Sequence, residues 1–534
     1  MNLSPEQIAG EYNTAQLYKD SIGSYGIREQ AKINERFFVG NQWYGANCGN
    51  SRPLVRHNVI KRIGDYKMSA LLSDNVEVRF SAEGVPNTVK NRKAVTEIRK
   101  NAALGNNVLS DLNSEEKISF VMEALNDYRR TTAHRVKFDS LLCTALKNAY
   151  ISGTGVIYTY WDDSIETGLY ADDAKTTPIK GDIVCETIPI ENLCFGDPRE
   201  TDLQKQPFII LSGNYSGEEV LEQVKRFSPQ NVDRFTESAE YKDGRVTLLT
   251  KLFKEYDKNG VASVYAVRTA AGVTVREKWN IGVRRYPLAV FCWETRPDCA
   301  YGHSEITYLI PNQIAINRMT TAKVWSVMSS GMPLLLVNGD IVDGDITNDP
   351  GQIIKVYGTA EDTENAVKYV SPPSDNLGYA DIIEPLIDNT LSASGANAAA
   401  LGDVAPNNTS AIIELQNAAR LPLITLKKRY FAFLEEISGI WAEFWIRVYG
   451  NRKLKQVDEN GVWYFDFSGK EYENLVLCAE ADVYSDTVLS TKDTIELLDK
   501  LFDKGIITAS QYLKRLPKGT VQSLNELIIS GKED

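Results

Sequence analysis

The residues of this sequence that could do chemistry include two pairs of adjacent aspartates, Asp162-Asp163 and Asp172-Asp173. A metal-dependent nuclease or a glycosidase uses two carboxylates that are separated along the chain and meet in a cleft. Adjacent aspartates in a polar stretch are instead typical of a solvated surface. We therefore interpret both pairs as surface residues and keep a metal-dependent nuclease as the enzymatic alternative.

Side chains that could hold a metal ion are few and scattered. The three histidines, His57, His134 and His303, lack the i, i+4 spacing with which two histidines share a metal ion on a helix. The seven cysteines never form a Cys-x-x-Cys motif, which predicts reduced, mostly buried thiols rather than a disulfide framework or a zinc site. We expect no metal ion and no cofactor.

Motifs for nucleotide binding and nucleophilic catalysis are missing from the sequence. A phosphate-binding P-loop ends in Gly-Lys-Ser or Gly-Lys-Thr, whereas both Gly-Lys pairs of this chain, Gly469-Lys470 and Gly531-Lys532, are followed by glutamate. The pair Gly153-x-Gly155 is half of a dinucleotide fingerprint, and we interpret it as a turn. The sequence has no Gly-x-Ser-x-Gly elbow and no His-Glu-x-x-His motif. We therefore predict that the chain is not an enzyme.

Hydrophobic periodicity divides the chain into helical and strand-rich regions. Apolar residues at steps of three and four predict helices at 4–18, 27–38, 58–72, 114–151, 304–330, 379–391, 409–449, 490–505 and 508–517. Runs of β-branched and aromatic residues predict strands at 156–161, 183–188, 207–213, 246–256, 261–269, 273–279, 286–294 and within 463–485. A second β-rich module is expected at 333–373. The pattern favours an α+β protein of more than one domain.

Three stretches depart from regular periodicity. Pro422 lies well inside the helical pattern of 409–449, and a kink is expected there because proline removes one backbone hydrogen bond and clashes with the preceding turn. Residues 86–113 are polar and charged and predict a loop or a marginal helix. Residues 392–408, rich in Gly, Ala and Asn, predict a mobile loop.

The composition is that of a folded protein with an acidic surface. The 534 residues exceed what one core usually holds, and 43% of them are hydrophobic. The formal net charge is −12, whereas a protein that holds DNA tightly usually presents a basic surface. The acidity does not argue against a passage for DNA, because the wall of such a passage should hold the polymer only weakly.

The sequence also predicts a protein without a membrane span. No apolar run reaches the ~18 residues that a spanning helix needs. The first residues lack the basic start and apolar run of a signal peptide. We expect a protein made in the cytosol.

Four segments, in this order along the chain, resemble the portal proteins of tailed bacteriophages. They are 36–63, which contains RFFVGNQWYG and RPLVRHNVIKRI; 188–210, IPIENLCFGDPRETDLQKQPFII; 286–322, YPLAVFCWETRPDCAYGHSEITYLIPNQIAINRMTTA; and 392–419, SASGANAAALGDVAPNNTSAIIELQNAA. In the third segment a Tyr-Pro strand leads to Gly302-His303-Ser304. A helix with Gln313 and Asn317 in the family's Gln-x-x-x-Asn pattern follows.

The resemblance implies the portal fold, an α+β architecture that forms a ring, usually of twelve subunits, at one vertex of a capsid. Its parts are a helical and β-rich wing, a two-helix stem, a small β-rich clip, a long kinked helix and a short helical crown. The expected bounds are 1–303 and the returning strands 451–489 for the wing, 304–331 and 374–391 for the stem, 332–373 for the clip, 392–408 for a tunnel loop, 409–450 for the long kinked helix and 490–534 for the crown.

The residues expected to meet DNA or partners follow from these parts. Arg318 and Lys323, on the polar side of the stem helix, would make weak, sequence-independent phosphate contacts if they face the channel. The closest approach to DNA is expected in the tunnel loop, at Asn397, Asp403, Asn407 and Asn408. Six acidic clip residues would dock a partner with basic patches: Asp340, Asp343, Asp345, Asp349, Glu361 and Asp362. The alternative interpretations are an ordinary core helix for the stem helix, a disordered connection for the tunnel loop and a solvated loop surface for the clip.

A portal of this family admits and releases double-stranded DNA without being an enzyme itself. The resemblance implies a place at the portal vertex of the virion, and in the host cytoplasm during assembly. The partners would be further copies of the chain, a terminase that uses ATP, the major capsid and scaffolding proteins, and head-completion or adaptor proteins, with no membrane. Another virion structural or adaptor protein is the alternative from the same class.

Overall fold

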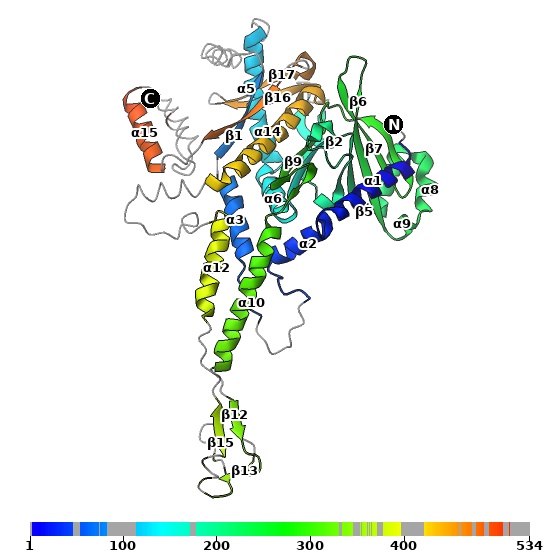
Figure 1. Ribbon diagram of the computed structural model, residues 1–534. Helices are drawn as coiled ribbons and strands as arrows, with labels where there is room; N and C mark the ends of the chain where they lie inside the picture. Colours follow the sequence, from blue (N-terminus) through cyan, green and yellow to red (C-terminus); the bar gives the residue numbers. More distant parts are fainter. Residues whose placement is uncertain are drawn as a thin grey trace. The chain divides into compact units, whose positions relative to one another are not determined.

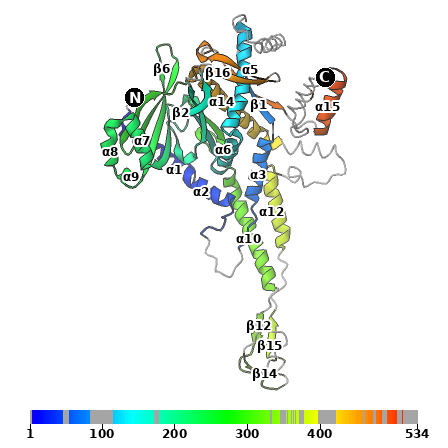
Figure 2. The same cartoon turned by 180° about the vertical axis from the view of Figure 1, so that it is seen from behind.

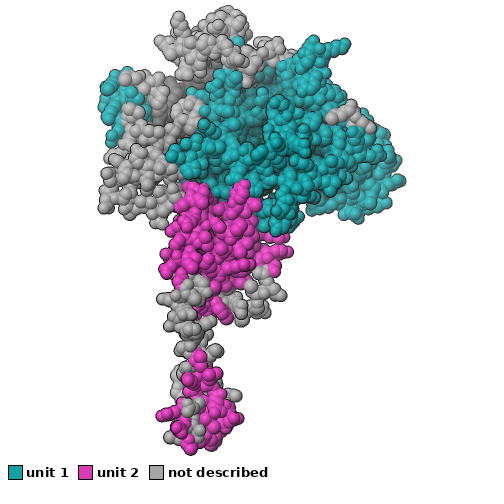
Figure 3. Space-filling model, viewed as in Figure 1, with its two compact units in different colours: residues 1–34, 65–305, 420–534 teal, residues 35–64, 306–419 magenta. Residues whose placement is uncertain are grey.

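The computed structural model describes residues 3–45, 54–73, 75–82, 114–170, 178–330, 334–344, 355–359, 366–370, 378–396, 421–458, 461–472, 477–484 and 491–505, and the single positions 353, 361, 364 and 512. The chain forms two units (Figure 3). The first unit comprises residues 1–34, 65–305 and 420–534, and the second comprises 35–64 and 306–419. Helices and strands occur in both, so the fold class is α+β.

Most of the described helices belong to the first unit (Figures 1 and 2). They are α1 (Pro5–Ser21), α5 (Ser114–Arg135), α6 (Phe138–Ser152), α7 (Gly217–Phe227), α8 (Val232–Thr236), α9 (Ala239–Lys242), α14 (Ile424–Arg447) and α15 (Thr491–Asp503). Two more helices, α2 (Gly26–Phe38) and α3 (Val59–Leu72), begin in one unit and end in the other.

A five-stranded antiparallel sheet forms one half of the first unit. Its strands follow one another in space as they do in the chain: β4 (Leu193–Phe195), β5 (Phe208–Ser216), β6 (Arg245–Tyr256), β7 (Ala262–Ala270) and β8 (Val273–Asn280). Side chains alternate between the two faces of a strand. On β6, Val246 and Leu248 pack with α7, whereas Leu249 and Phe253 pack with α1. Helices therefore cover both faces of this sheet.

A second, three-stranded sheet has the order β3-β2-β9, with β2 (Thr154–Tyr170), β3 (Pro178–Thr187) and β9 (Leu288–Cys292). The short hairpin of β10 (Glu294–Arg296) and β11 (Cys299–His303) follows β9. At the predicted turn Gly153-x-Gly155, Gly153 ends α6 with φ of 90°, whereas Thr154 and Gly155 already belong to β2. A Cβ atom on Gly302 would lie 2.2 Å from the backbone oxygen of Gly153, so the two glycines let these backbones meet.

The last part of the first unit joins distant parts of the sequence. β1 (Asn75–Ala82) pairs antiparallel with β18 (Leu477–Tyr484), and β16 (Asn451–Asp458) pairs with β17 (Gly461–Ser468). On α14, Trp441 and Trp445 are fully buried. Trp445 packs edge-on against Phe80 of β1 at 5.9 Å between ring centroids, so α14 supports this strand pair.

The second unit contains two long helices and two small strand pairs. The helices are α10 (Ile306–Ser330) and α12 (Tyr379–Ala393), which lie side by side and run in opposite directions (Figures 1 and 2). A hydrogen bond of 3.2 Å from Asn312 to Thr390 joins them. The strand pairs are β12 (Leu334–Val337) with β15 (Val367–Val370) and β13 (Val342–Asp343) with β14 (Lys355–Val356).

The structure confirms most of the predicted elements and adds some. The strand-rich region was predicted without α7, α8 and α9, which lie between β5 and β6. The helix predicted at 114–151 is two helices, because Lys137 between them has a left-handed backbone with φ of 52°. Pro422 lies in a short 3-10 turn, Leu421–Leu423, directly before α14. Residues 409–420 lie outside the described residues, so the kink is not tested.

Candidate functional site

The candidate site lies in the second unit, along α10. Residues 54–58, which we call the strap, precede α3 and pack against α10 through two amide side chains. Gln313 and Asn317 are 1% and 2% exposed. Gln313 donates to the carbonyl of His57 at 2.6 Å and accepts from the amide of Val59 at 3.0 Å. Asn317 accepts from the amide of His57 at 3.1 Å, so both amides hold the same backbone turn.

The two amide side chains also bond to each other and to a third. Gln313 donates to Asn317 at 2.9 Å, and Asn317 donates to the side-chain oxygen of Gln42 at 2.6 Å. Gln42 in turn donates to the carbonyl of Phe37 at 3.0 Å. The Gln-x-x-x-Asn pattern on α10 therefore has a structural role here, as a fully bonded polar cluster that fixes the strap. Its sequence signal is two amides on the same side of the helix as Ile306 and Ile310.

The apolar side of α10 is covered over about the first two thirds of the helix. Thr321 makes the last contact with the strap, accepting from the amide of Val55 at 3.1 Å. Beyond it, Val327 is 66% exposed and Met328 is 43% exposed. On α12, Ile382 is 52% exposed. The second unit thus leaves apolar side chains of both helices accessible in the single chain.

Arg318 and Lys323 are both exposed on α10. Neither makes a hydrogen bond or ion pair with any other residue that the structure describes. Because an α-helix turns by about 100° per residue, these two side chains point in directions about 140° apart. If one narrow polar strip of α10 faced a channel, it would therefore contain Arg318 or Lys323 but not both.

Three of the six acidic clip residues are described. Asp340, Asp343 and Glu361 are exposed, and Asp343 accepts a hydrogen bond from the hydroxyl of Tyr357 at 3.1 Å across the β13–β14 pair. The other three, and all four tunnel-loop residues, lie outside the described residues: Asp345, Asp349, Asp362, Asn397, Asp403, Asn407 and Asn408.

Of the residues considered for enzymatic chemistry, those that the structure describes form no cluster. Asp163 is exposed and lies 3.4 Å from Arg226 in an ion pair, whereas Asp172-Asp173 lie outside the described residues. Within the described ranges, no group of three or more His, Cys, Asp or Glu side chains could hold a metal ion. His303 contacts Arg296 at 2.6 Å, and burial lowers its pKa.

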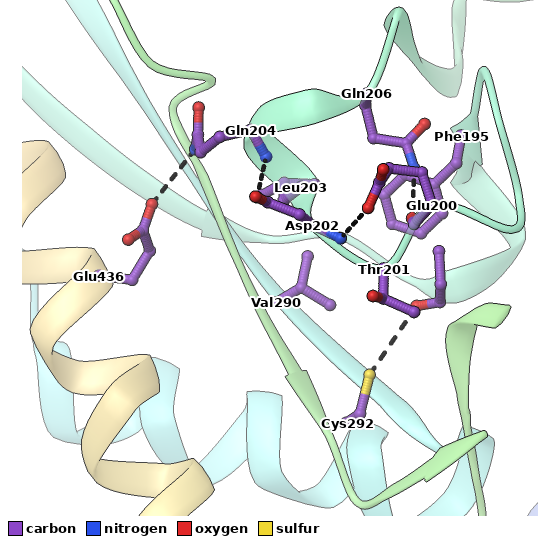
Figure 4. A pocket seen from close by; sticks show the side chains of 11 residues that line it. Phe195, Glu200, Thr201, Asp202, Leu203, Gln204, Gln206, Val290, Cys292 and Glu436 are labelled. Carbon is purple, nitrogen blue, oxygen red and sulfur yellow. Dashed lines mark hydrogen bonds between the residues drawn. The ribbon is translucent and has the colours of Figure 1, made fainter. Parts of the chain in front are cut away.

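One cavity of the first unit, of about 260 Å³, brings carboxylates and a thiol together (Figure 4). Its polar groups are bonded among themselves: Glu200 accepts from the amide of Asp202, and Gln204 donates to Glu436 at 3.2 Å. Burial raises the pKa of the Cys292 thiol to about 11, so this thiol is neutral and a poor nucleophile near pH 7. We find no nucleophile and base in contact around this cavity.

Comparisons with known proteins found only distant similarity. No protein-family model matches the sequence, and no curated protein matches it. Among solved structures, a chain of the virion of a native gene transfer agent particle is 11% identical with a TM-score of 0.35, over 94% of this chain and 98% of that one. A chain of the neck of an empty gene transfer agent particle is 10% identical with a TM-score of 0.32, over 88% and 96%. Scores this low carry no argument about the fold or the function of this chain.

No helix in the described part of the chain is long and apolar enough to cross a membrane.

Proposed function

We propose that this chain is the subunit of a portal ring at one vertex of a tailed-phage-like virion, through which double-stranded DNA is packaged and ejected. The observation that carries the proposal is the open apolar side of the α10–α12 pair. Val327 and Ile382 would be unfavourably exposed in a monomer, and each would gain ~1–2 kcal/mol if a neighbouring subunit covered it. A ring supplies such a neighbour to every copy.

The order of elements supports the same proposal. The four sequence segments that resemble portal proteins occur in the family's order. The structure has a helix at 306–330, short strands between 334 and 370, and a helix at 379–393, in the order of a stem helix, a clip and a second stem helix. In this proposal the strap, held by Gln313 and Asn317, braces the first stem helix.

The proposed surfaces for partners follow from charge. The exposed acidic residues Asp340, Asp343 and Glu361 would bind basic patches of head-completion or adaptor proteins. Arg318 or Lys323 would touch passing DNA weakly and without sequence preference. ATP hydrolysis would belong to a separate terminase, and the capsid and scaffolding proteins would surround the ring.

Mass and symmetry of the purified protein test this proposal. Native mass spectrometry with class-averaged electron micrographs should give a closed ring of about twelve subunits with a central channel. If the protein alone is monomeric, the same measurement is repeated with capsid and scaffolding proteins. A protein that forms no ring under either condition contradicts the proposal.

A further inference from the structure

A continuous row of alternating arginine and aromatic side chains lies on the first unit. Its members, in spatial order, are Arg226, Phe227, Arg276, Trp279 and Arg268, and we call them the arginine ladder. The guanidinium carbons lie 5.0, 4.3, 4.0 and 5.6 Å from the successive ring centroids. Each distance is within the range of a cation–π contact.

The five residues come from the end of α7 and from two neighbouring strands. Arg268 on β7 and Arg276 on β8 are directly paired across the strands, at an irregular register next to a bulge. Like charges in directly opposed positions destabilise a sheet. The placement of these arginines therefore calls for a compensating negative charge.

The described residues supply little of that charge. Asp163 lies 3.4 Å from Arg226, but both side chains are mostly exposed, at 71% and 63%. Glu186 is near enough to Arg268 for the arginine to lower its pKa, although burial raises that pKa overall. No carboxylate of the described chain forms an ion pair with Arg268 or Arg276.

Arg276, in the middle of the ladder, makes no hydrogen bond or ion pair with any described residue. Its pKa is lowered, first by burial and then by the charges of Arg268 and Arg226. Arg268 donates to Gln223 at 3.0 Å, and its buried Nε atom has no acceptor. Two neighbouring guanidinium groups therefore keep N–H donors that lack partners among the residues that the structure describes.

The geometry selects the kind of anion. A guanidinium group stacked on a ring still presents its N–H groups at its edge, where a phosphate can accept two of them. Each ring of the ladder already has two arginines within 4.0–5.6 Å of its centroid, which leaves less ring surface for stacked bases or for apolar side chains of a protein partner. A polymer with a regularly repeated phosphate suits a row of three cations better than an acidic peptide does.

We propose that the arginine ladder binds the phosphate backbone of duplex DNA without sequence preference. All five residues belong to the first unit of one chain, so the site does not depend on the ring or on the proposed function. This patch is the local exception to the net charge of −12, which is otherwise unfavourable for binding DNA.

The experiment measures binding of the full chain to a labelled, covalently closed circle of duplex DNA over a series of salt concentrations. A closed circle cannot thread through a ring, so a channel does not contribute to the signal. Arg276→Gln should weaken binding at least about tenfold at low salt and lower the slope of log K against log[salt] by about 1. Lys258→Gln, an exposed lysine in the turn between β6 and β7 and outside the ladder, should change neither the affinity nor the slope by a comparable amount.

Two further variants distinguish the contribution of the stacked guanidinium group to DNA binding from the contribution of its charge. Arg276→Lys keeps the charge but loses the planar fork, and should bind between the unmodified protein and Arg276→Gln. The combined Arg226, Arg268 and Arg276→Gln variant should lower the slope by about 3. Thermal unfolding of each variant shows that it is folded before binding is compared.

Two outcomes would overturn the proposal. One is equal affinity and equal salt slope for the unmodified protein, Arg276→Gln and the combined variant. The other is a ladder-dependent binding of a polyglutamate peptide with no ladder-dependent binding of DNA, which would assign the site to an acidic protein. Either result leaves the ring experiment unaffected.

Discussion

Replacing Gln313 with leucine should destabilise the second unit strongly although the two side chains have similar volumes. Gln313→Leu removes four hydrogen bonds of 2.6–3.4 Å, to His57, Val59, Ile60 and Asn317. Such a hydrogen bond contributes a net ~0.5–1.5 kcal/mol, so the expected loss in the free energy of unfolding is about 2–6 kcal/mol. The Val59 amide and the His57 carbonyl keep a 2.9 Å hydrogen bond to each other in the variant. The loss of unfolding free energy therefore stays below the cost of leaving both groups buried without any hydrogen bond.

The measurement combines urea unfolding with hydrogen exchange of the peptide that contains the strap. The variant should unfold at lower urea and exchange faster over residues 54–60, because the amides there lose their acceptors on α10. Thr321→Val is the matched control. It removes bonds of 3.1 and 3.4 Å to Val55 at a half-buried position where water can replace them, so it should cost no more than about 1 kcal/mol.

The reasoning is wrong if Gln313→Leu costs no more than Thr321→Val. It is also wrong if the variant loses stability but the strap exchanges at its original rate, because the loss would then arise elsewhere on α10.

Three further predictions concern the ring, a backbone contact and a buried tyrosine. Val327→Asp should prevent ring formation in native mass spectrometry, while the melting temperature of the chain stays within a few degrees. Tyr256 is equally exposed on the first unit, and Tyr256→Asp should leave the rings intact. Gly302→Ala should cost more than about 3 kcal/mol of unfolding free energy because its Cβ meets a backbone oxygen, while Gly10→Ala, with open space on α1, should be neutral or stabilising in the same denaturant assay. Burial raises the pKa of Tyr158 from 10.0 to about 12. The stability that this difference contributes is complete below pH 10 and is lost as pH rises toward 12. Tyr158→Phe should therefore show a shallower fall in denaturation midpoint over that interval, and equal falls for the two proteins would refute the assignment.

The periodicity of the sequence was sufficient for elements with a local signal. The apolar stripe of α10 and the β-branched runs of the five-stranded sheet mark their own positions. α7 also carries a local signal, because Ser216 and Glu219 have the spacing of a capping box and the Ser216 side chain caps the helix in the structure.

Other features depend on contacts that no local pattern encodes. The two-residue turn at Ala271-Gly272 pairs Ala270 with Val273, which would set Arg268 opposite residue 275 in a regular hairpin. The bulge shifts its partner to Arg276, and that shift places two arginines of the ladder opposite each other. The burial of Gln313 likewise requires a strap from about 250 residues earlier, as its bond to Val59 spans 254 positions.

The pairing of β1 with β18 can form only late in the synthesis of the chain. Asn75 pairs with Tyr484, so 409 residues (484 − 75) are added after Asn75 until its partner is made. At ~5–20 residues per second this delay is roughly 20–80 s. During that time the first unit cannot complete this sheet, and the edge of β1 is open to other chains. A cell that makes many copies at once would therefore need to protect the nascent chain until β18 emerges.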